Sequence, residues 1–125
     1  MSELARVGDW LARWAERQRL PAELVFAMRL CLEEVLANIV MHAPAESDQN
    51  ILVAGRCDAH NVVLTVEDDG DAFDPAAAAA RQTSRPTDRE IGGHGLILLA
   101  RYASRLAYER DRGRNRLTLT FKAGD

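Results

Sequence analysis

The sequence predicts an α+β fold in which a mainly antiparallel sheet carries helices packed on one face. Residues 4–43 have apolar residues at helical spacing, whereas residues 51–68 and 105–122 contain segments that read as strands. The predicted order is helix, helix, hairpin, helix, hairpin, with no internal repeat and no linker between domains. A chain of 125 residues, 47% hydrophobic and 28% charged, is expected to form a single globular domain over residues 1–125.

Two helices are predicted before the first strand. The first has apolar residues at helical spacing with charges between them: Leu4, Val7, Leu11 and Trp14. It ends near Arg19, and Pro21 can open the second helix because a proline in the first turn loses no hydrogen bond. The second helix is expected to run to about Ala43, before Pro44. It is apolar around most of its circumference, so we expect it to be largely buried.

Two hairpins are predicted, one in the middle of the chain and one at its C-terminal end. Their predicted strands are residues 51–57 with 62–68 and residues 105–110 with 116–122. Short connections, residues 58–61 and 111–113, join the strands of each pair. Between the hairpins we expect a short helix over residues 76–80, a polar loop over residues 81–89 and a helix over about residues 95–103.

The composition excludes several classes of protein. The formal net charge is -3 and no strongly basic stretch occurs, so nucleic-acid binding is not expected. No apolar run approaches the roughly 20 residues that a membrane span needs, and the N-terminus lacks the pattern of a signal peptide. Cys31 and Cys57 form no CxxC pair, so neither a disulfide framework nor a zinc site is expected. We therefore expect a cytoplasmic protein.

The most informative segment is the glycine-rich phrase from Glu90 to Leu96. Gly92, Gly93 and Gly95 lie within four residues, and an apolar helical segment follows them. Glycine lets a backbone approach a ligand closely, and the free N–H groups at the start of a helix favour anions such as phosphate. The alternative interpretation is a tight turn that only precedes a helix.

A polar stripe on the second helix is the next feature. Glu34, Asn38 and His42 are four residues apart and so share one face. If the stripe lines a pocket, Asn38 could offer its amide oxygen to a hard cation, and Glu34 could accept a proton from a substrate hydroxyl. The alternative is a buried network that only ties the core together. Arg29 and Glu33, also four apart, are expected to pair at the surface.

The third feature is the acidic phrase over residues 67–73, where the second strand ends. Alternation puts Asp68 on the same face as the apolar residues of the strand, so this acid points toward the core. A carboxylate there needs a donor, which the exocyclic amine of adenine would provide. Asp69 and Asp71 are expected to be solvated, and the alternative for the whole phrase is a simple Asp-Gly turn.

The polar loop between these features contains three arginines, Arg81, Arg85 and Arg89. As part of a lid over a ligand they could contact phosphate groups. The alternative is a solvated basic loop without that function. His60 and His94 are expected to be surface residues.

Taken together, these phrases resemble the motifs of the GHKL ATP-binding domain that gyrase, MutL and sensor histidine kinases share. Within that family they look like the anti-sigma-factor serine kinases of the RsbW and SpoIIAB type. The matching phrases are Glu34 to Asn38 with His42-Ala43, Asp68 to Pro75, and Gly92 to Leu96. Their order and spacing agree over roughly residues 20–122.

The resemblance implies a two-layer α/β sandwich of the Bergerat type that uses ATP and Mg²⁺. Asn38 would hold Mg²⁺ against the phosphates, Asp68 would bind the adenine amine, and Glu34 would be the catalytic base. The implied nucleotide-binding residues are Asn38, Asp68, Gly70, Ala72, Phe73, Gly92, Gly93, His94, Gly95 and Leu96. Two features depart from the family pattern: Ala72 stands where a second glycine is usual, and the usual first strand is missing, which puts a homodimer built on that strand in doubt.

The implied function is that of an anti-sigma factor with serine/threonine kinase activity. It would phosphorylate a STAS-domain antagonist, bind a sigma factor and so regulate transcription by partner switching. The alternative is a module that binds nucleotide, or none, and inhibits its partner without phosphorylation; Ala72 and the missing strand favour it. A third possibility, the catalytic part of a sensor histidine kinase, is disfavoured because no helical segment carries a phosphoacceptor histidine.

Overall fold

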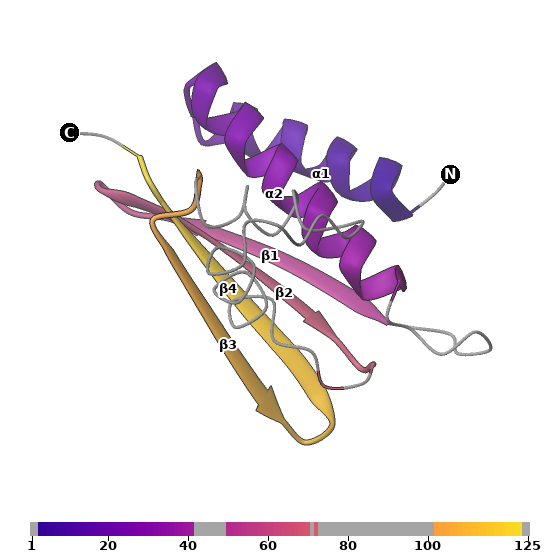
Figure 1. The fold of residues 1–125 in the computed structure, drawn as a ribbon. Coiled ribbons are helices and arrows are strands. Elements are labelled where there is room, and N and C mark those ends of the chain that lie inside the picture. The colour runs from indigo at the N-terminus through magenta and orange to yellow at the C-terminus, as the bar shows by residue number, and fades with distance from the viewer. Residues whose placement is uncertain (1–2, 42–49, 71, 73–101, 124–125) are drawn as a thin grey trace, which may run out of the picture.

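The computed structural model describes residues 3–41, 50–70, 72 and 102–123 (Figure 1). Two helices come first, α1 (Glu3–Arg17) and α2 (Ala22–Met41). They are followed by the strands β1 (Ile51–Cys57), β2 (Asn61–Asp68), β3 (Arg105–Asp111) and β4 (Arg114–Lys122). Neither described helix is long and apolar enough to cross a membrane.

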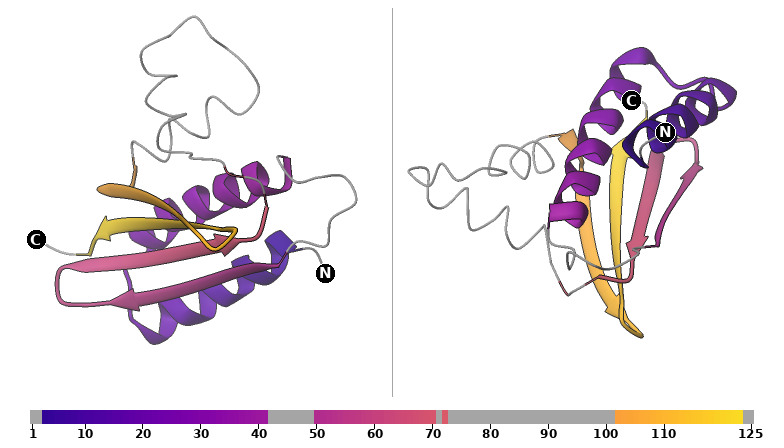
Figure 2. Two further views of the ribbon diagram at one scale, coloured as in Figure 1. Left: turned by 90° about the horizontal axis from the view of Figure 1, so that it is seen from below. Right: turned by 90° about the vertical axis from the view of Figure 1, so that its right-hand side faces the viewer.

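The four described strands form one sheet in the order β1-β2-β4-β3, and every neighbouring pair is antiparallel. Both helices cover the same face of this sheet, with α1 over β1 and α2 running obliquely across the middle strands (Figures 1 and 2). The predicted α+β architecture, with an antiparallel sheet and helices on one face, is therefore confirmed.

The core lies between α2 and the covered face of the sheet. Alternation along β2 and β4 supplies one wall, because the even-numbered residues of β2 pair with the odd-numbered residues of β4 and face the helices. The best-buried side chains are Leu11 from α1, Met28, Cys31, Leu32, Val35 and Leu36 from α2, and Val62, Leu64, Val66, Leu119 and Phe121 from the sheet. The prediction that α2 is largely buried is correct only for the face toward the sheet, because Phe26 and Val40 on the other side are exposed.

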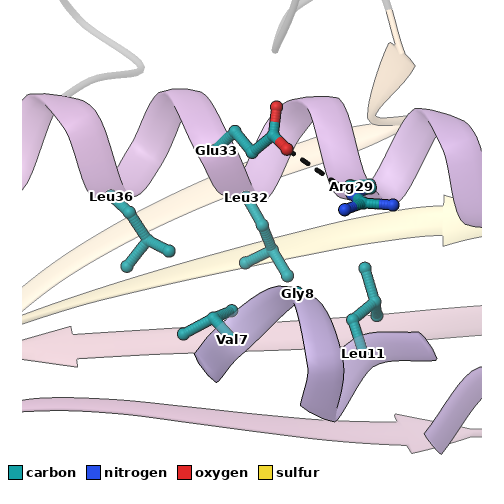
Figure 3. Close-up of a pocket in the computed structure, with 7 residues that line it drawn as sticks. All are labelled: Val7, Gly8, Leu11, Arg29, Leu32, Glu33 and Leu36. Atoms are coloured by element: carbon teal, nitrogen blue, oxygen red, sulfur yellow. Dashed lines mark ion pairs between the residues drawn. The ribbon is translucent and has the colours of Figure 1, made fainter. Parts of the chain in front are cut away.

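The two helices contact each other at Gly8, where α1 has no side chain (Figure 3). Gly8 lies between Val7 and Leu11, and together they face Leu32 and Leu36 of α2, leaving a gap of only about 10 Å³. At the rim, Arg29 Nε lies 3.5 Å from Glu33 Oε1, and both side chains are more than half exposed. The predicted surface pair is thus present, although an exposed pair of this kind stabilises a fold by about 0.5 kcal/mol at most.

The second hairpin differs from the prediction at its turn. The predicted strands stop at residue 110 and restart at residue 116, whereas Asp111 pairs with Arg114 and only two residues form the loop. Those two residues have positive φ, 53° at Arg112 and 76° at Gly113, as a tight hairpin turn requires. The strands are longer as a result, and β4 gains Asn115.

The remaining predicted elements fall mostly outside the described residues. These are the short helix over residues 76–80, the polar loop over residues 81–89 and most of the helix over residues 95–103. At the end of that last segment, Tyr102 is helical and Ala103 is buried in the core.

Candidate functional site

A row of side chains crosses the sheet where β2 ends. Asp68 pairs with Asn115 of β4, and Asn115 pairs with Arg110 of β3. Paired residues of neighbouring strands share a face, so all three lie on the face that the helices cover. Asp68 is 5% exposed and Asn115 is 7% exposed, which makes them two of the few polar residues buried in the described part of the chain. The predicted inward direction of Asp68 is borne out.

The Asp68 carboxylate is held through one of its two oxygens. The Gly70 N–H donates to Oδ2 over 3.2 Å, and Asn115 Nδ2 donates to the same atom over 3.4 Å. A buried carboxylate is stabilised by hydrogen-bond donors, and an amine of a ligand can serve as a further donor to its oxygens.

Asn115 is itself tied to β3 and to the turn after β2. Tyr108 Oη donates to Asn115 Oδ1 over 2.5 Å, and Arg110 Nη1 donates to the same oxygen over 3.0 Å. Arg110 Nη1 also donates to the Gly70 carbonyl over 2.9 Å. The sequence analysis missed these three residues. The burial of Asn115 could have been predicted, because alternation along β4 puts it on the same face as Leu117 and Leu119.

The α2 stripe approaches this end of the sheet from the helix side. Figures 1 and 2 show that α2 ends over the edge of the sheet where β2 ends and β1 begins. Asn38, one turn before that end, is 5% exposed and lies on the buried face with Cys31 and Val35. Its Nδ2 atom is buried and has no hydrogen-bond partner among the described residues. A buried amide in that condition favours a ligand over the purely structural network that was the alternative.

Glu34 lies one turn before Asn38 and is half-buried. The structure gives it no hydrogen bond to Asn38, so the two side chains do not form a closed pair. Its charge acts on the next buried group: burial, and then the negative charge of Glu34, raise the pKa of the Cys31 thiol to about 12. Glu34 therefore lies beside the apolar core but remains accessible to solvent. A catalytic base needs such access, because its substrate has to reach it.

The fit of a magnesium ion can be judged from Asn38. No group of three or more His, Cys, Asp or Glu side chains in the described part of the chain could hold a metal. Mg²⁺ is commonly bound by few protein ligands and takes most of its oxygens from phosphate and water. The unpartnered Asn38 amide fits that arrangement, since rotation of the amide group brings Oδ1 to the place of Nδ2.

Several predicted site residues lie outside the described residues. They are His42, Asp71, Phe73, Arg81, Arg85, Arg89, Gly92, Gly93, His94, Gly95 and Leu96. Of the others, Asp69 is exposed as predicted and its Oδ1 accepts a hydrogen bond from the Asn50 N–H over 3.2 Å. Ala72 and His60 are also exposed.

Comparison with known proteins shows the family to which this domain belongs. Residues 1–121 match the family described as the histidine kinase-like ATPase domain. The serine/threonine-protein kinase BtrW of Bordetella bronchiseptica is 38% identical over 117 residues, which cover 89% of this chain and 80% of that protein.

Solved structures share the fold at low sequence identity. The histidine kinase domain of the blue-light activated histidine kinase EL346 from Erythrobacter litoralis superposes with a TM-score of 0.60 at 17% identity, covering 96% of this chain and 59% of that one. The histidine kinase AdeS of Acinetobacter baumannii gives 0.55 at 13% identity, covering 81% and 48%. The chain thus spans about half the length of these kinases.

A chain of the SiaB–SiaC complex of Pseudomonas aeruginosa is similar over more of its length. The TM-score is 0.58 at 16% identity, and the similarity covers 98% of this chain and 85% of that one. The expected GHKL-type domain, an ATPase domain of the kinase type, is thereby confirmed. With the fold and a match over residues 1–121 in agreement, the chain belongs to the histidine kinase-like ATPase domain family.

Proposed function

We propose that this protein is an ATP-binding anti-sigma regulatory factor that acts as a serine/threonine kinase on a STAS-domain antagonist. The observation that carries the nucleotide part of the proposal is the buried Asp68 carboxylate at the end of β2, whose Oδ2 is held by the Gly70 N–H and by Asn115. The kinase part is supported by the retained Glu34 and by the similarity to a serine/threonine-protein kinase.

In this proposal each polar residue of the site has one task. Asp68 accepts the hydrogen bond of the adenine amine, and Gly70 lets the turn approach the ring. Asn38 holds Mg²⁺, which supplies charge neutralisation of the phosphates when it is bound. Glu34 orients the hydroxyl of the protein substrate and accepts its proton. Phosphoryl transfer depends chiefly on positioning and on neutralisation of charge, so these few side chains are sufficient to catalyse it.

The remaining predicted contacts belong to the same proposal. The glycine-rich phrase Gly92 to Leu96 would cradle the phosphates, and Arg81, Arg85 and Arg89 would contact them from a lid. Phe73 and Ala72 would flank the adenine. The same proposal includes a cytoplasmic location and a sigma factor as the second partner. The similarity to a chain of the SiaB–SiaC complex supports a protein partner.

A second candidate is a nucleotide-binding module that inhibits a sigma factor or other partner without phosphorylating it. Ala72 favours this function, because a methyl group there stands where a second glycine is usual in the family. A homodimer is left open by both candidates.

Two measurements test the proposal. Calorimetric titration of the protein with Mg-ATP should show binding that Asp68→Ala weakens by about ten- to a hundredfold, the effect of one charge-assisted hydrogen bond. Transfer of labelled phosphate to a STAS-domain protein should occur with the unchanged protein and be lost in Glu34→Gln. Glu33→Gln, at the neighbouring exposed position of α2, is the matched control and should leave transfer intact.

The outcomes separate the two candidates. ATP binding without phosphate transfer indicates the inhibitory module. Equal transfer by the unchanged protein and Glu34→Gln removes Glu34 from the reaction. Absence of ATP binding, or ATP affinity that Asp68→Ala leaves unchanged, contradicts the nucleotide site itself.

A further inference from the structure

Two side chains of the edge strand β3 converge on one amide of β4. Tyr108 Oη and Arg110 Nη1 both donate to Asn115 Oδ1, over 2.5 Å and 3.0 Å. An amide oxygen has two lone pairs, so these donors occupy its acceptor sites. Asn115 Nδ2 must therefore point away from β3, and it donates toward Asp68 Oδ2 and the Gly70 carbonyl, over 3.4 Å and 3.5 Å.

From this arrangement we propose that Tyr108 and Arg110 are positioning residues that set the preference of the site for adenine over purines with a 6-carbonyl. They act through Asn115, whose amide they lock with its NH₂ group toward Asp68. The inference rests on the proposed function, because it requires ATP to bind at Asp68.

The locked amide controls what Asp68 can accept. Both protein donors engage Oδ2, and Oδ1 is the oxygen that accepts a hydrogen bond from the ligand. Adenine carries an amine at C6 and donates to such an oxygen. Hypoxanthine and guanine carry a carbonyl there, which places two acceptors against each other, and a site built to accept a hydrogen bond rejects a ligand that cannot donate one.

A freely rotating Asn115 would weaken that discrimination. If the amide turned over, its Oδ1 would face Asp68 Oδ2, and two acceptors would stand against each other. The carboxylate would lose a donor and its fixed orientation, and with them its selectivity for an amine at C6. Tyr108 and Arg110 remove this option by holding the oxygen on the β3 side.

Arg110 also ties down the turn that follows β2. Its Nη1 donates to the Gly70 carbonyl over 2.9 Å, while the Gly70 N–H donates to Asp68. The position of the turn is thus set by a strand that lies 40 residues further along the chain. One guanidinium group fixes both the orientation of the Asn115 amide and the backbone next to the acid.

The test compares ATP with inosine triphosphate, which differs from ATP at C6. Affinities for both nucleotides would be measured with Mg²⁺ for the unchanged protein and for Tyr108→Phe, Arg110→Met and the double variant. We expect the double variant to lose about tenfold in ATP affinity while inosine triphosphate binds equally well or better, so that the ratio of the two falls about tenfold or more. Glu109→Gln lies between these positions on the opposite face and should leave the ratio unchanged.

The outcomes distinguish this inference from the function on which it rests. If the unchanged protein prefers ATP and the double variant weakens both nucleotides equally, Tyr108 and Arg110 only stabilise the fold and the inference is wrong. An unchanged ratio with unchanged affinities also overturns it. Failure of the unchanged protein to bind ATP would overturn the proposed function together with the inference.

Discussion

The indole ring of Trp14 lies directly against Gly55 of β1. A methyl group on Gly55 would come within 2.9 Å of Cη2 and Cζ2 of Trp14, closer than such contacts occur. Trp14 has little freedom to move, because it stacks on Trp10 with ring centroids 5.6 Å apart and an interplanar angle of 13°. The absence of a side chain at residue 55 therefore determines how closely α1 packs on the edge of the sheet.

Gly55→Ala should destabilise the fold by about 1–3 kcal/mol, the usual penalty for forcing extra volume into a packed contact. Urea denaturation of the purified variant measures this. Ala54→Val is the matched control, since Ala54 is exposed on the other face of the same strand and should tolerate the change. Combined with Trp14→Phe, the Gly55→Ala penalty should shrink, because the smaller ring leaves room for the methyl group. Additive effects in that double variant would contradict the proposed contact.

Gly8→Ala should stabilise the fold, in contrast to Gly55→Ala. A methyl group on Gly8 would meet only Arg29 Nη2, at an ordinary contact distance of 3.7 Å. Glycine inside a helix is less favourable than alanine by roughly 0.5–1 kcal/mol, and Gly8 lies near the middle of α1. We expect the variant to be more stable by about that amount in the same denaturation experiment. A loss of stability would mean that the two helices pack more tightly at Gly8 than this structure has them.

Stability should fall at alkaline pH because of Cys31. Burial first, and then the charge of Glu34, raise the pKa of its thiol from 9.0 to about 12. Above the ordinary value the unfolded chain releases the thiol proton while the native chain keeps it, so unfolding is favoured as pH rises. The effect approaches about 1.4 kcal/mol per pH unit between the two values.

Cys31→Ala isolates this effect. The variant loses packing at every pH, but its stability should decline less steeply than that of the unchanged protein above about pH 9. Cys57→Ala is the control: burial and Asp58 also raise the pKa of that thiol, but Cys57 is only half-buried, so a smaller change of slope is expected. Parallel curves for Cys31→Ala and the unchanged protein would show that the thiol does not contribute.

Asn38 is expected to lower the stability of the nucleotide-free protein. Its buried Nδ2 has no partner among the described residues, and an unsatisfied buried polar group costs about 1–3 kcal/mol. Asn38→Leu should therefore raise the stability without nucleotide by about 1 kcal/mol or more and reduce the additional stabilisation that Mg²⁺ gives to the ATP complex. Ala37→Leu, on the exposed face of α2, should change neither. A less stable Asn38→Leu protein would indicate that the amide is satisfied within the native chain.

The same residue allows a test of the metal. Titrations of ATP with and without Mg²⁺ should differ for the unchanged protein, because in the proposed function Asn38 would hold the ion that neutralises the phosphates. Asn38→Ala should bind ATP with nearly equal affinity in both conditions. If the variant still requires Mg²⁺, the ion is held elsewhere.

Much of the framework could be predicted because its causes are local. The strands β1 and β2 were predicted to within one residue, since period-two alternation and a polar connection are properties of a few neighbouring residues. The second hairpin was predicted less well. Its turn consists of only two residues, and Arg112 adopts a positive φ that composition does not suggest.

The sequence by itself determined that Asp68 faces inward, because it follows Val62, Leu64 and Val66 at a spacing of two in one strand. It also determined the order of the phrases that mark the family. Only the tertiary structure decided that Asn115 contacts this acid, that Arg110 contacts the turn after it and that Trp14 rests on Gly55. The first two of these contacts join residues 47 and 40 positions apart, and they depend on strand register, which many distant contacts fix together.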